Sequence, residues 1–194
     1  MSSVRITAGT LRGRRVAVPP HDLRPTSERA RQAYFNIVAD HVAGARFLDL
    51  FAGSGIFSFE AVSRGAASAT AVDRDKQSAT NISRHAAAFG VPVLTVTGDV
   101  LTQLKRLHEP FDLVYADPPY DYEEYDKLLA GIAAMPLATD AIVAIEHRRS
   151  TSPFNRGPRP EARGLATWRR AEYGEVWITF FRAEAATGIA MRNE

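Results

Sequence analysis

The sequence contains no cysteine and no long apolar run, and these two absences narrow the class of protein. A chain without cysteine has neither a disulfide framework nor a thiolate metal site. Its most apolar strand-like run covers residues 141–145, whereas a membrane-spanning helix needs roughly 18 consecutive apolar residues. The first residues also lack the apolar segment of a secretory signal. We therefore expect a soluble, cytoplasmic protein with no membrane partner.

Histidine is scarce as well, and its distribution gives no metal site. No two of the five histidines have metal-ligand spacing on one helix face. With 194 residues and 45% hydrophobic content, the chain can form one well-cored domain with a small appendage. A metal-free monomer is the default expectation.

The net charge of +2 is the sum of three regions of opposite sign. Residues 1–31 carry seven arginines against two acids, for a net charge of +5. Residues 32–147 have a net charge of −7, and residues 148–170 carry seven arginines against one acid. A single charged run is usually solvated surface. Two arginine-rich runs around an acidic centre instead favour a nucleic-acid partner, because guanidinium groups pair with phosphate oxygens.

Segments with strand-like and helix-like patterns alternate through the middle of the chain. The predicted strands are 47–50, 69–72, 93–96, 111–116 and 141–145, and the predicted helices are 56–64, 76–89, 100–107 and 122–134. Such alternation implies right-handed crossovers and a mostly parallel sheet with helices on both faces. The sequence therefore predicts an α/β, Rossmann-like fold.

The regions on either side of this core predict two hairpins. The N-terminal pair of short strands leads into a helix, and the C-terminal pair closes the sheet as an antiparallel hairpin. These pairs are 4–8 with 15–18, and 167–173 with 176–181, and residues 150–164 form an extended loop. We divide the chain into a basic hairpin extension, the α/β domain and a C-terminal tail, at 1–31, 32–184 and 185–194.

Doubly wound sheets bind ligands beyond the carboxyl ends of their strands, so the loops after the strands are the candidate site. The first loop contains Asp49, Gly53 and Gly55. Glycine lets the backbone turn tightly and approach a ligand, although many such pairs are ordinary turns and Asp49 can instead cap a helix. A dinucleotide fingerprint needs a third glycine where Ser58 stands. The loop also lacks lysine, which favours a cationic cofactor bearing an amino acid over a diphosphate.

The next two strand ends also carry acids, each with two interpretations. Asp73 can accept hydrogen bonds from both hydroxyls of a ribose, or it can cap the helix that follows. Asp99 can accept a hydrogen bond from an adenine amino group, or it can be a helix N-cap.

The fourth strand ends in the motif Asp117-Pro118-Pro119-Tyr120. Its prolines fix the backbone, so that the Asp117 carboxylate and the Pro118 carbonyl form a rigid pair of acceptors. Such a pair can hold both N–H groups of an exocyclic amine and direct its lone pair toward a methyl donor. Tyr120 offers a ring on which a base can stack. The alternative is a structural turn with an exposed tyrosine.

Taken together, these motifs resemble the bacterial RsmD family of class I S-adenosylmethionine-dependent methyltransferases, from about Val4 to Arg182. The resemblance rests on residues 9–14, 24–26, 29, 31, 35–36, 48–55, 60–61, 63–66, 81 and 117–120. Members of that family methylate the N2 amine of one guanine in 16S ribosomal RNA, so the resemblance implies this activity. Asp73 is a departure, since such families often carry Glu there.

The resemblance and the motifs define a set of expected site residues. The expected catalytic residues are Asp117, Pro118 and Tyr120. The residues expected to bind S-adenosylmethionine are Asp49, Phe51, Gly53, Gly55, Asp73 and Asp99. The residues expected to bind RNA are Arg5, Arg12, Arg14, Arg15, Arg24, Arg29 and Arg31. The expected partner is 16S rRNA within the small ribosomal subunit or its assembly intermediate.

Three other functions remain open from the sequence. The nearest is an amino-methyltransferase that acts on adenine N6 in DNA or on guanine in another RNA. The chain has little room for a separate target-recognition domain, which disfavours a sequence-specific DNA enzyme. A non-catalytic RNA-binding assembly factor and a dinucleotide oxidoreductase are the other two, and the incomplete glycine fingerprint disfavours the last.

Overall fold

The computed structural model describes residues 2–18, 28–150, 154 and 164–184. In chain order the elements are β1 (Ser3–Arg5), β2 (Arg15–Ala17), α1 (Glu28–Ile37), the 3₁₀ helix η1 (Ala39–His41), β3 (Arg46–Leu50), α2 (Ile56–Ser63), β4 (Ser68–Asp73), α3 (Lys76–Phe89), β5 (Val93–Thr97), α4 (Val100–Leu104), β6 (Phe111–Ala116), α5 (Tyr125–Ala134), β7 (Leu137–Arg148), β8 (Leu165–Tyr173) and β9 (Val176–Ala183). This alternation of strands and helices confirms the predicted α/β class.

A seven-stranded sheet forms the centre of the molecule, with the order β5-β4-β3-β6-β7-β9-β8. The strands from β3 to β7 are parallel, and β9 runs antiparallel between β7 and β8. The predicted closing hairpin is therefore confirmed. The strand order reverses between β3 and β6, and this reversal creates the switch point at which doubly wound sheets bind ligands.

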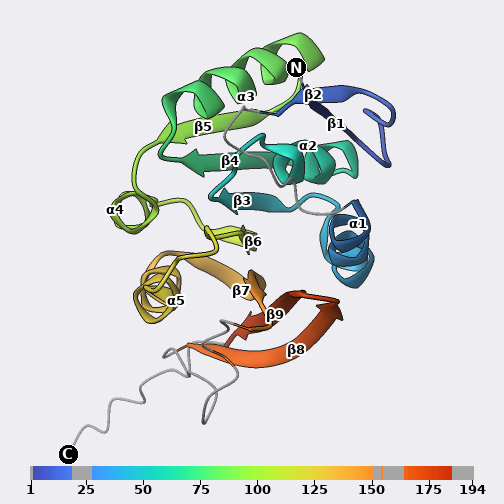
Figure 1. Cartoon of the computed structure of the whole chain (residues 1–194). Helices are drawn as coiled ribbons and strands as arrows, with labels where there is room; N and C mark the ends of the chain where they lie inside the picture. Colours follow the sequence, from blue (N-terminus) through green and yellow to red (C-terminus); the bar gives the residue numbers. More distant parts are fainter. Residues whose placement is uncertain (1, 19–27, 151–153, 155–163, 185–194) are drawn as a thin grey trace, which may run out of the picture.

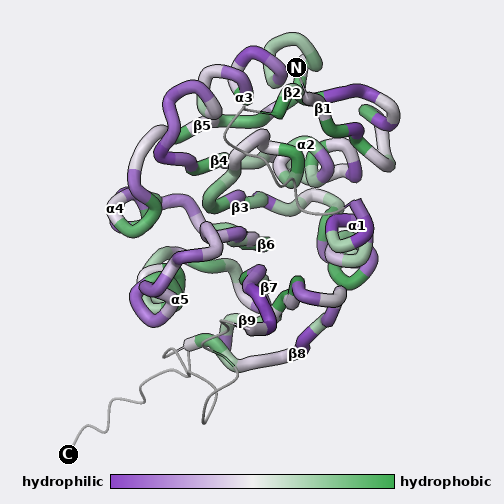
Figure 2. Tube along the Cα trace, viewed as in Figure 1, coloured by the Kyte–Doolittle hydropathy of each residue, from purple (hydrophilic) through white to green (hydrophobic). Residues whose placement is uncertain are grey.

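Helices cover both faces of the sheet (Figure 1). One core joins the sheet to α1, α2 and α3, and the other joins it to α4 and α5. Alternate residues of β3 serve the two cores, because Phe47 lies in the first whereas Leu48 and Leu50 lie in the second. Hydrophilic residues lie along the outer turns of α3 and α5, away from the hydrophobic strands (Figure 2). This pattern is typical of a parallel sheet that is buried on both sides.

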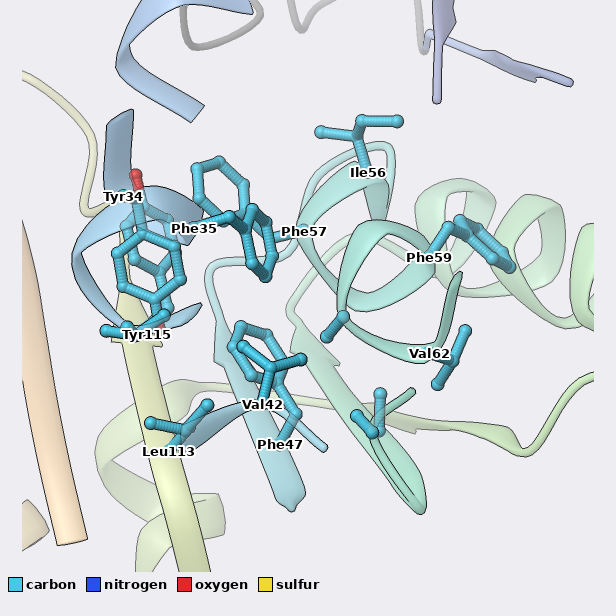
Figure 3. Close-up of a cluster of buried hydrophobic side chains, with 14 of the residues drawn as sticks. Tyr34, Phe35, Val42, Phe47, Ile56, Phe57, Phe59, Val62, Leu113 and Tyr115 are labelled. Carbon is cyan, nitrogen blue, oxygen red and sulfur yellow. The ribbon is translucent and has the colours of Figure 1, made fainter. Parts of the chain in front are cut away.

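Aromatic rings fill the first core next to the strand that leads to the fourth loop (Figure 3). Phe57 of α2 stacks on Tyr115 of β6, with ring centroids 3.7 Å apart. Tyr34 and Phe35 of α1 pack around them, and the Tyr34 ring lies 4.9 Å from that of Tyr115. Each large buried side chain stabilises the fold by roughly 1.5–3 kcal/mol. The cluster therefore fastens α1 and α2 to β6, whose next residue is Asp117.

The N-terminal hairpin of β1 and β2 packs on the end of α2. Thr10 N donates to Ser63 O at 2.8 Å, and Leu11 N donates to Ser63 Oγ at 2.9 Å. Gly9 makes this approach possible, because it has a φ of 78° and an added Cβ would lie 1.7 Å from Ser63 O. The boundary expected between residues 31 and 32 lies inside α1.

Several element bounds differ from the prediction. β7 has twelve residues rather than the predicted five, because Leu137 also pairs with β6 and the polar residues Glu146 to Arg148 pair with β9. α5 begins at Tyr125 rather than at 122, because Tyr122 N donates to Pro119 O and extends the preceding turn. α4 ends at Leu104, and η1 was not predicted. Arg24 and most of the predicted loop 150–164 lie outside the described residues.

Two features are absent from the described part of the chain. No helix within it is long and apolar enough to cross a membrane. The same residues contain no group of three or more histidine, aspartate or glutamate side chains arranged to hold a metal ion.

Candidate active site

The four loops predicted from the sequence meet at one edge of the sheet. In the ladders Leu50 is level with Val72 on one side and with Ala116 on the other, and Val72 is level with Val96. The backbone N–H of Asp117 donates to Leu50 O at 3.3 Å and thus joins the fourth loop to the end of β3. The structure therefore brings the predicted cofactor and catalytic residues together at the switch point.

Asp49 holds the first loop through hydrogen bonds to Ser58. It is 2% exposed, and its Oδ2 accepts hydrogen bonds from Ser58 N at 3.0 Å and from Ser58 Oγ at 2.7 Å. Gly55 at the N-cap of α2 has no side chain, so Asp49 caps this helix from the neighbouring strand. Burial raises the pKa of Asp49 to about 7, despite the Ser58 hydrogen bonds. The structure therefore shows the capping alternative for Asp49, and contact of its carboxylate with the cofactor stays a prediction.

The two glycines of this loop have different tasks. Gly53 has a φ of 53°, and its N–H donates to Asp73 Oδ2 at 2.7 Å. Gly55 has a φ of 75°, and an added Cβ would lie 2.7 Å from Cγ1 of Ile82 on α3. Gly55 therefore permits the close packing of α2 and α3, whereas Gly53 turns the backbone at the ligand edge.

Phe51 stands in the left-handed region with a φ of 61°, which is costly for a residue with a side chain. It is the first residue after β3, and its ring makes an edge contact with Tyr122 at a centroid distance of 5.3 Å. The strained backbone thus places an aromatic ring between the first and fourth loops.

Asp73 joins the first two loops. Its Oδ2 accepts from Gly53, and its Oδ1 accepts from Asp75 N at 2.8 Å. Capping of α3 is done by Asp75, which accepts a hydrogen bond from Ser78 N at 2.7 Å. The helix-cap interpretation of Asp73 is therefore wrong, and the residue lies half-buried at the edge where a ribose would be bound.

Asp99 is the N-cap of α4. Its Oδ1 accepts from both N and Oγ1 of Thr102 at 2.9 Å. The structure therefore shows Asp99 as a helix cap. Its exposed side chain also lies at the edge where the parallel strands end.

The fourth loop presents the predicted acceptors and an exposed ring. Pro118 is buried and holds the loop, whereas Asp117 is half-buried and Tyr120 is 44% exposed. The guanidinium carbon of Arg148, at the end of β7, lies 3.6 Å from the centroid of the Tyr120 ring. An exposed aromatic ring beside two fixed acceptors is an arrangement suited to holding a flat base with an amino group.

Tyr122 is a residue of this edge that the sequence analysis missed. Its ring lies between those of Phe51 and Tyr125, and its buried Oη has no hydrogen-bond partner among the described residues. Burial, followed by the charges of Glu124 and Asp99, raises the pKa of Tyr122 to about 12, so the hydroxyl is a donor. A buried hydroxyl without a partner costs free energy, and a polar ligand at this edge would supply the missing acceptor.

A second missed feature is a buried pair beneath the fourth loop. Tyr115 Oη donates to Glu146 Oε2 at 2.5 Å, and both side chains are almost fully buried. Burial, together with the charge of Asp117, raises the pKa of Glu146 well above its usual value. This direction favours the neutral form of Glu146, which does not repel the Asp117 carboxylate. The signal in the sequence was an acid directly after the apolar run 141–145.

Arg31 does not have its expected role in RNA binding. It is 0% exposed, its Nε lies 3.2 Å from Glu60 Oε1, and a terminal nitrogen donates to Arg5 O at 3.0 Å. Arg64 binds the other oxygen of Glu60 at 3.0 Å, and Thr7 N donates to Glu60 Oε1 at 2.7 Å. The guanidinium of Arg31 is thus enclosed by the hairpin and α2, where no phosphate can reach it.

The remaining described arginines of the N-terminal segment are exposed. The turn of the N-terminal hairpin lies away from the carboxyl ends of the strands, because this turn contacts Ser63, the last residue of α2. Arg14 stacks 4.9 Å from the ring centroid of Phe89, the last residue of α3. α3 begins near Asp73 and is roughly 21 Å long at 1.5 Å per residue. Arg14 is therefore about one helix length from the candidate site.

Comparison with known proteins agrees with this geometry. Residues 4–182 match the family described as conserved hypothetical protein 95. The chain is 35% identical over 119 residues to ribosomal RNA small subunit methyltransferase D of Escherichia coli strain K12, and this alignment spans 60% of this chain and 60% of that protein. It is 28% identical over 191 residues to YlbH of Bacillus subtilis strain 168, which covers 92% of this chain and 98% of that one.

A solved structure extends the likeness to the whole fold. The structure of yhhF from Escherichia coli superposes with a TM-score of 0.82 at 28% identity, over 95% of this chain and 99% of that chain. The family match, the strand order and the position of the loops at the switch point indicate the same family. The chain therefore belongs to the conserved hypothetical protein 95 family, which is the RsmD family of S-adenosylmethionine-dependent methyltransferases.

Proposed function

We propose that this protein transfers a methyl group from S-adenosylmethionine to the exocyclic N2 amine of a guanine in 16S rRNA. The observation that carries the proposal is the position of Asp117-Pro118-Pro119-Tyr120. This motif follows β6 at the switch point, and a backbone hydrogen bond joins it to the end of β3. It sets two acceptors and an exposed ring beside the glycine loop of the neighbouring strand.

The residues at this edge fit the proposed cofactor. Gly53 leaves the backbone open at the end of β3, Asp73 lies where ribose hydroxyls would be bound, and the unpartnered Oη of Tyr122 can donate to a ligand acceptor. When bound, S-adenosylmethionine supplies an electrophilic methyl group on a sulfonium. Asp49 holds the first loop in place through its hydrogen bonds to Ser58.

The fourth loop provides the chemistry at the target base. The Asp117 carboxylate and the Pro118 carbonyl accept the two N–H groups of the amine and thereby hold its lone pair in line with the methyl carbon. The amine nitrogen would form the new bond to the methyl carbon while the methyl–sulfur bond breaks and its electron pair stays on the sulfur of the departing thioether, and Asp117 would accept the proton that the amine loses. Tyr120 stacks on the base after it is turned out of the RNA. No covalent enzyme intermediate is required.

The choice of small-subunit ribosomal RNA follows the name of the Escherichia coli relative, and the choice of guanine N2 follows from the motif resemblance to the RsmD family. The partner in this proposal is the small ribosomal subunit or its assembly intermediate, and the location is the cytoplasm, where such subunits are made. A monomer needs no residue from a second chain, because the described strand ends supply all the proposed groups.

The test is transfer of labelled methyl from S-adenosylmethionine to small ribosomal subunits that lack this modification, with the modified base mapped. Label on one guanine N2 of 16S rRNA is the expected result. Label on an adenine, or label only on another nucleic acid, would show that the target is not a guanine of 16S rRNA. Absence of cofactor binding in calorimetry would overturn the assignment of the site.

The cofactor site has a test of its own in Tyr122→Phe. This change removes one hydroxyl and keeps the ring that packs on Phe51. Calorimetry should show an affinity for S-adenosylmethionine that is lower by about tenfold, the effect of one hydrogen bond. Equal affinity of the two proteins would remove Tyr122 from the cofactor site.

A further inference from the structure

The second arginine-rich run reaches the same edge of the sheet as the candidate active site. Arg148 is the last residue of β7 and pairs with Val176, the first residue of β9. The next residue, Arg149, donates its N–H to Glu175 O at 3.0 Å. Because Arg148 also lies over Tyr120, the end of β7 adjoins the fourth loop, and the alternation of side chains turns Arg148 to the other face of the sheet from Trp177. We call Arg148, Arg149, Arg170 and Trp177 the arginine corner.

The guanidinium groups of the arginine corner stack on aromatic rings. Those of Arg149 and Arg170 lie 5.7 Å and 4.9 Å from the centroid of the Trp177 ring. Arg170 also donates to Phe154 O at 3.0 Å, which restricts its position further. A guanidinium that stacks by its face keeps its N–H groups in the plane, where they can pair with phosphate oxygens. The corner is therefore a preorganised set of cations.

The surroundings of the corner are basic on balance. Glu172 faces Trp177 across the β8–β9 ladder, and Glu175 lies in the turn between these strands. Against these two acids Arg149, Arg169 and Arg170 contribute three arginines, while Arg148 lies over Tyr120, whose loop carries Asp117 and Asp121. Such a surface attracts a polyanion.

The combination of cations with a ring indicates one class of polyanion. Proteins that bind single-stranded nucleic acid place basic groups along the backbone and aromatic rings against the bases. Duplex RNA is recognised mainly by shape and by contacts with its backbone, which do not need a stacking ring. A base that is turned out for modification also requires its neighbouring strand to be held.

We propose that the arginine corner binds the single-stranded RNA that flanks the target base. Arg149 and Arg170 contact its phosphates, a base stacks on Trp177, and Arg148 joins this surface to Tyr120. The proposal depends on the proposed function only for the link to a target base. Binding of RNA at the corner can be measured without methyl transfer.

The two tryptophans of the chain allow a direct test by fluorescence. Trp177 belongs to the corner, whereas Trp168 on β8 contacts Phe180 and stacks with Arg182. The variants Trp168→Phe and Trp177→Phe each keep one tryptophan, and each is titrated with single-stranded poly(U). We expect quenching of Trp177 that weakens as salt rises, and no quenching of Trp168. Quenching of Trp168 alone, or of neither, would overturn the proposal.

Substitutions measure the affinity for the same probe. Trp177→Ala should weaken binding of poly(U) by at least about fivefold, the lower range for loss of one stacked base. Trp168→Ala is the matched control and should bind as the parent does. Circular dichroism of each variant identifies a loss of fold, in which case the fluorescence of the phenylalanine variants decides.

The charges are tested by the double variant Arg149→Ala with Arg170→Ala. The slope of log affinity against log salt should become less steep by about 1.4, as expected for two lost phosphate contacts on a single strand. Arg84→Ala removes an exposed arginine of α3 and should leave the slope unchanged. An unchanged slope in the double variant would contradict the proposal, as would duplex RNA that binds more tightly than poly(U).

Failure of this inference can be distinguished from failure of the proposed function. If the parent protein methylates small subunits but the Trp168→Phe variant shows no quenching, the proposed function stands and the RNA site at the corner is rejected. A protein that shows the quenching but neither binds S-adenosylmethionine nor transfers methyl retains the corner as an RNA site and loses the proposed reaction.

Discussion

Helices α2 and α3 each run from the edge where the strands end, the strand-end edge, to the N-terminal hairpin, the hairpin end. These two ends differ in how their polar groups are used. At the hairpin end, one glutamate, Glu60, receives hydrogen bonds from Arg31, Arg64 and Thr7 in a buried network. At the strand-end edge, Phe51 has a strained backbone and Tyr122 has a buried hydroxyl without a partner among the described residues. The hairpin end holds a buried ion-pair network in which only Nη1 of Arg31 has no partner among the described residues, whereas the strand-end edge combines a strained aromatic residue with an unpartnered hydroxyl, as functional sites commonly do.

The two arginine-rich runs show the same contrast. In the N-terminal run Arg31 is buried against a carboxylate, and Arg14 lies at the far end of α3. In the C-terminal run Arg148 and Arg149 stack on aromatic rings beside the fourth loop. Two runs with seven arginines each thus have different roles, because their partners in the fold differ. Substitutions at the hairpin end should alter stability, and those at the strand-end edge should alter activity.

The largest expected effect is on stability and comes from Glu60→Gln. This change leaves the buried guanidinium of Arg31 without its counter-charge, which should lower the free energy of unfolding by about 3–5 kcal/mol. Urea denaturation measures the change. The control is Asp112→Asn, which breaks a half-exposed pair with Arg46 and should cost no more than about 1 kcal/mol. Equal losses in the two variants would contradict the stabilising role of the hairpin end.

Asp117→Ala should have the next largest effect, and it should act on activity alone. Loss of one of the two amine acceptors should lower the rate of methyl transfer by about 100- to 1,000-fold. Urea denaturation should show little change in stability, because Asp117 lies half-buried in a loop. Asp121→Ala, an exposed acid of the same loop, is the control. If Asp117→Ala kept full activity with an unchanged cofactor affinity, the catalytic assignment would be lost.

The pH dependence of stability should depend on Asp49. Its pKa is about 7 in the folded protein, above the unfolded value of 3.8, so the folded state binds the extra proton between these values. Its contribution to stability is therefore complete below about pH 4 and is lost as the pH rises to about 7. Asp49→Asn should show a smaller fall in unfolding free energy between pH 5 and pH 8 than the parent. An unchanged difference between the two pH values would show that Asp49 is already ionised.

The smallest effect is expected from the triple change of Arg12, Arg14 and Arg15 to alanine. RNA affinity should fall and its salt dependence should flatten, because up to three phosphate contacts are lost. The rate of methyl transfer at saturating RNA should be unchanged, since these side chains lie at the far end of the helices. Filter binding across a salt series and initial rates measure the two quantities. A reduced rate at saturation would show that the hairpin acts at the site.

Much of the fold could be predicted from the sequence. The periodicity of apolar residues and the positions of glycine predicted β6 and α3 with their observed bounds, and the other central strands within a few residues. The ends of β7 and the start of α5 were missed. At β7 polar residues continue the ladder, and at α5 the turn after Pro119 delays the helix. Both are effects of hydrogen bonds whose partners lie elsewhere in the chain.

The candidate site was predicted in part. The four strand-end loops were identified correctly as one edge, because parallel strands place their carboxyl ends together. The roles of single residues at this edge were predicted less completely. Asp49 and Asp99 proved to be helix caps, while Tyr122 and Glu146 were not recognised. Burial and an unsatisfied hydroxyl are properties of the folded chain, and no local pattern reveals them.

The sequence by itself determined the α/β class and the acids that end the strands, because both follow from the order of apolar segments and turn residues. The tertiary structure alone decided what each charged side chain does. Arg31 meets Glu60 from 29 positions away, and Arg148 meets the Tyr120 ring across two strand ends. An arginine binds a phosphate, a carboxylate or a ring according to which lies beside it, and only the packing of distant segments sets that neighbour.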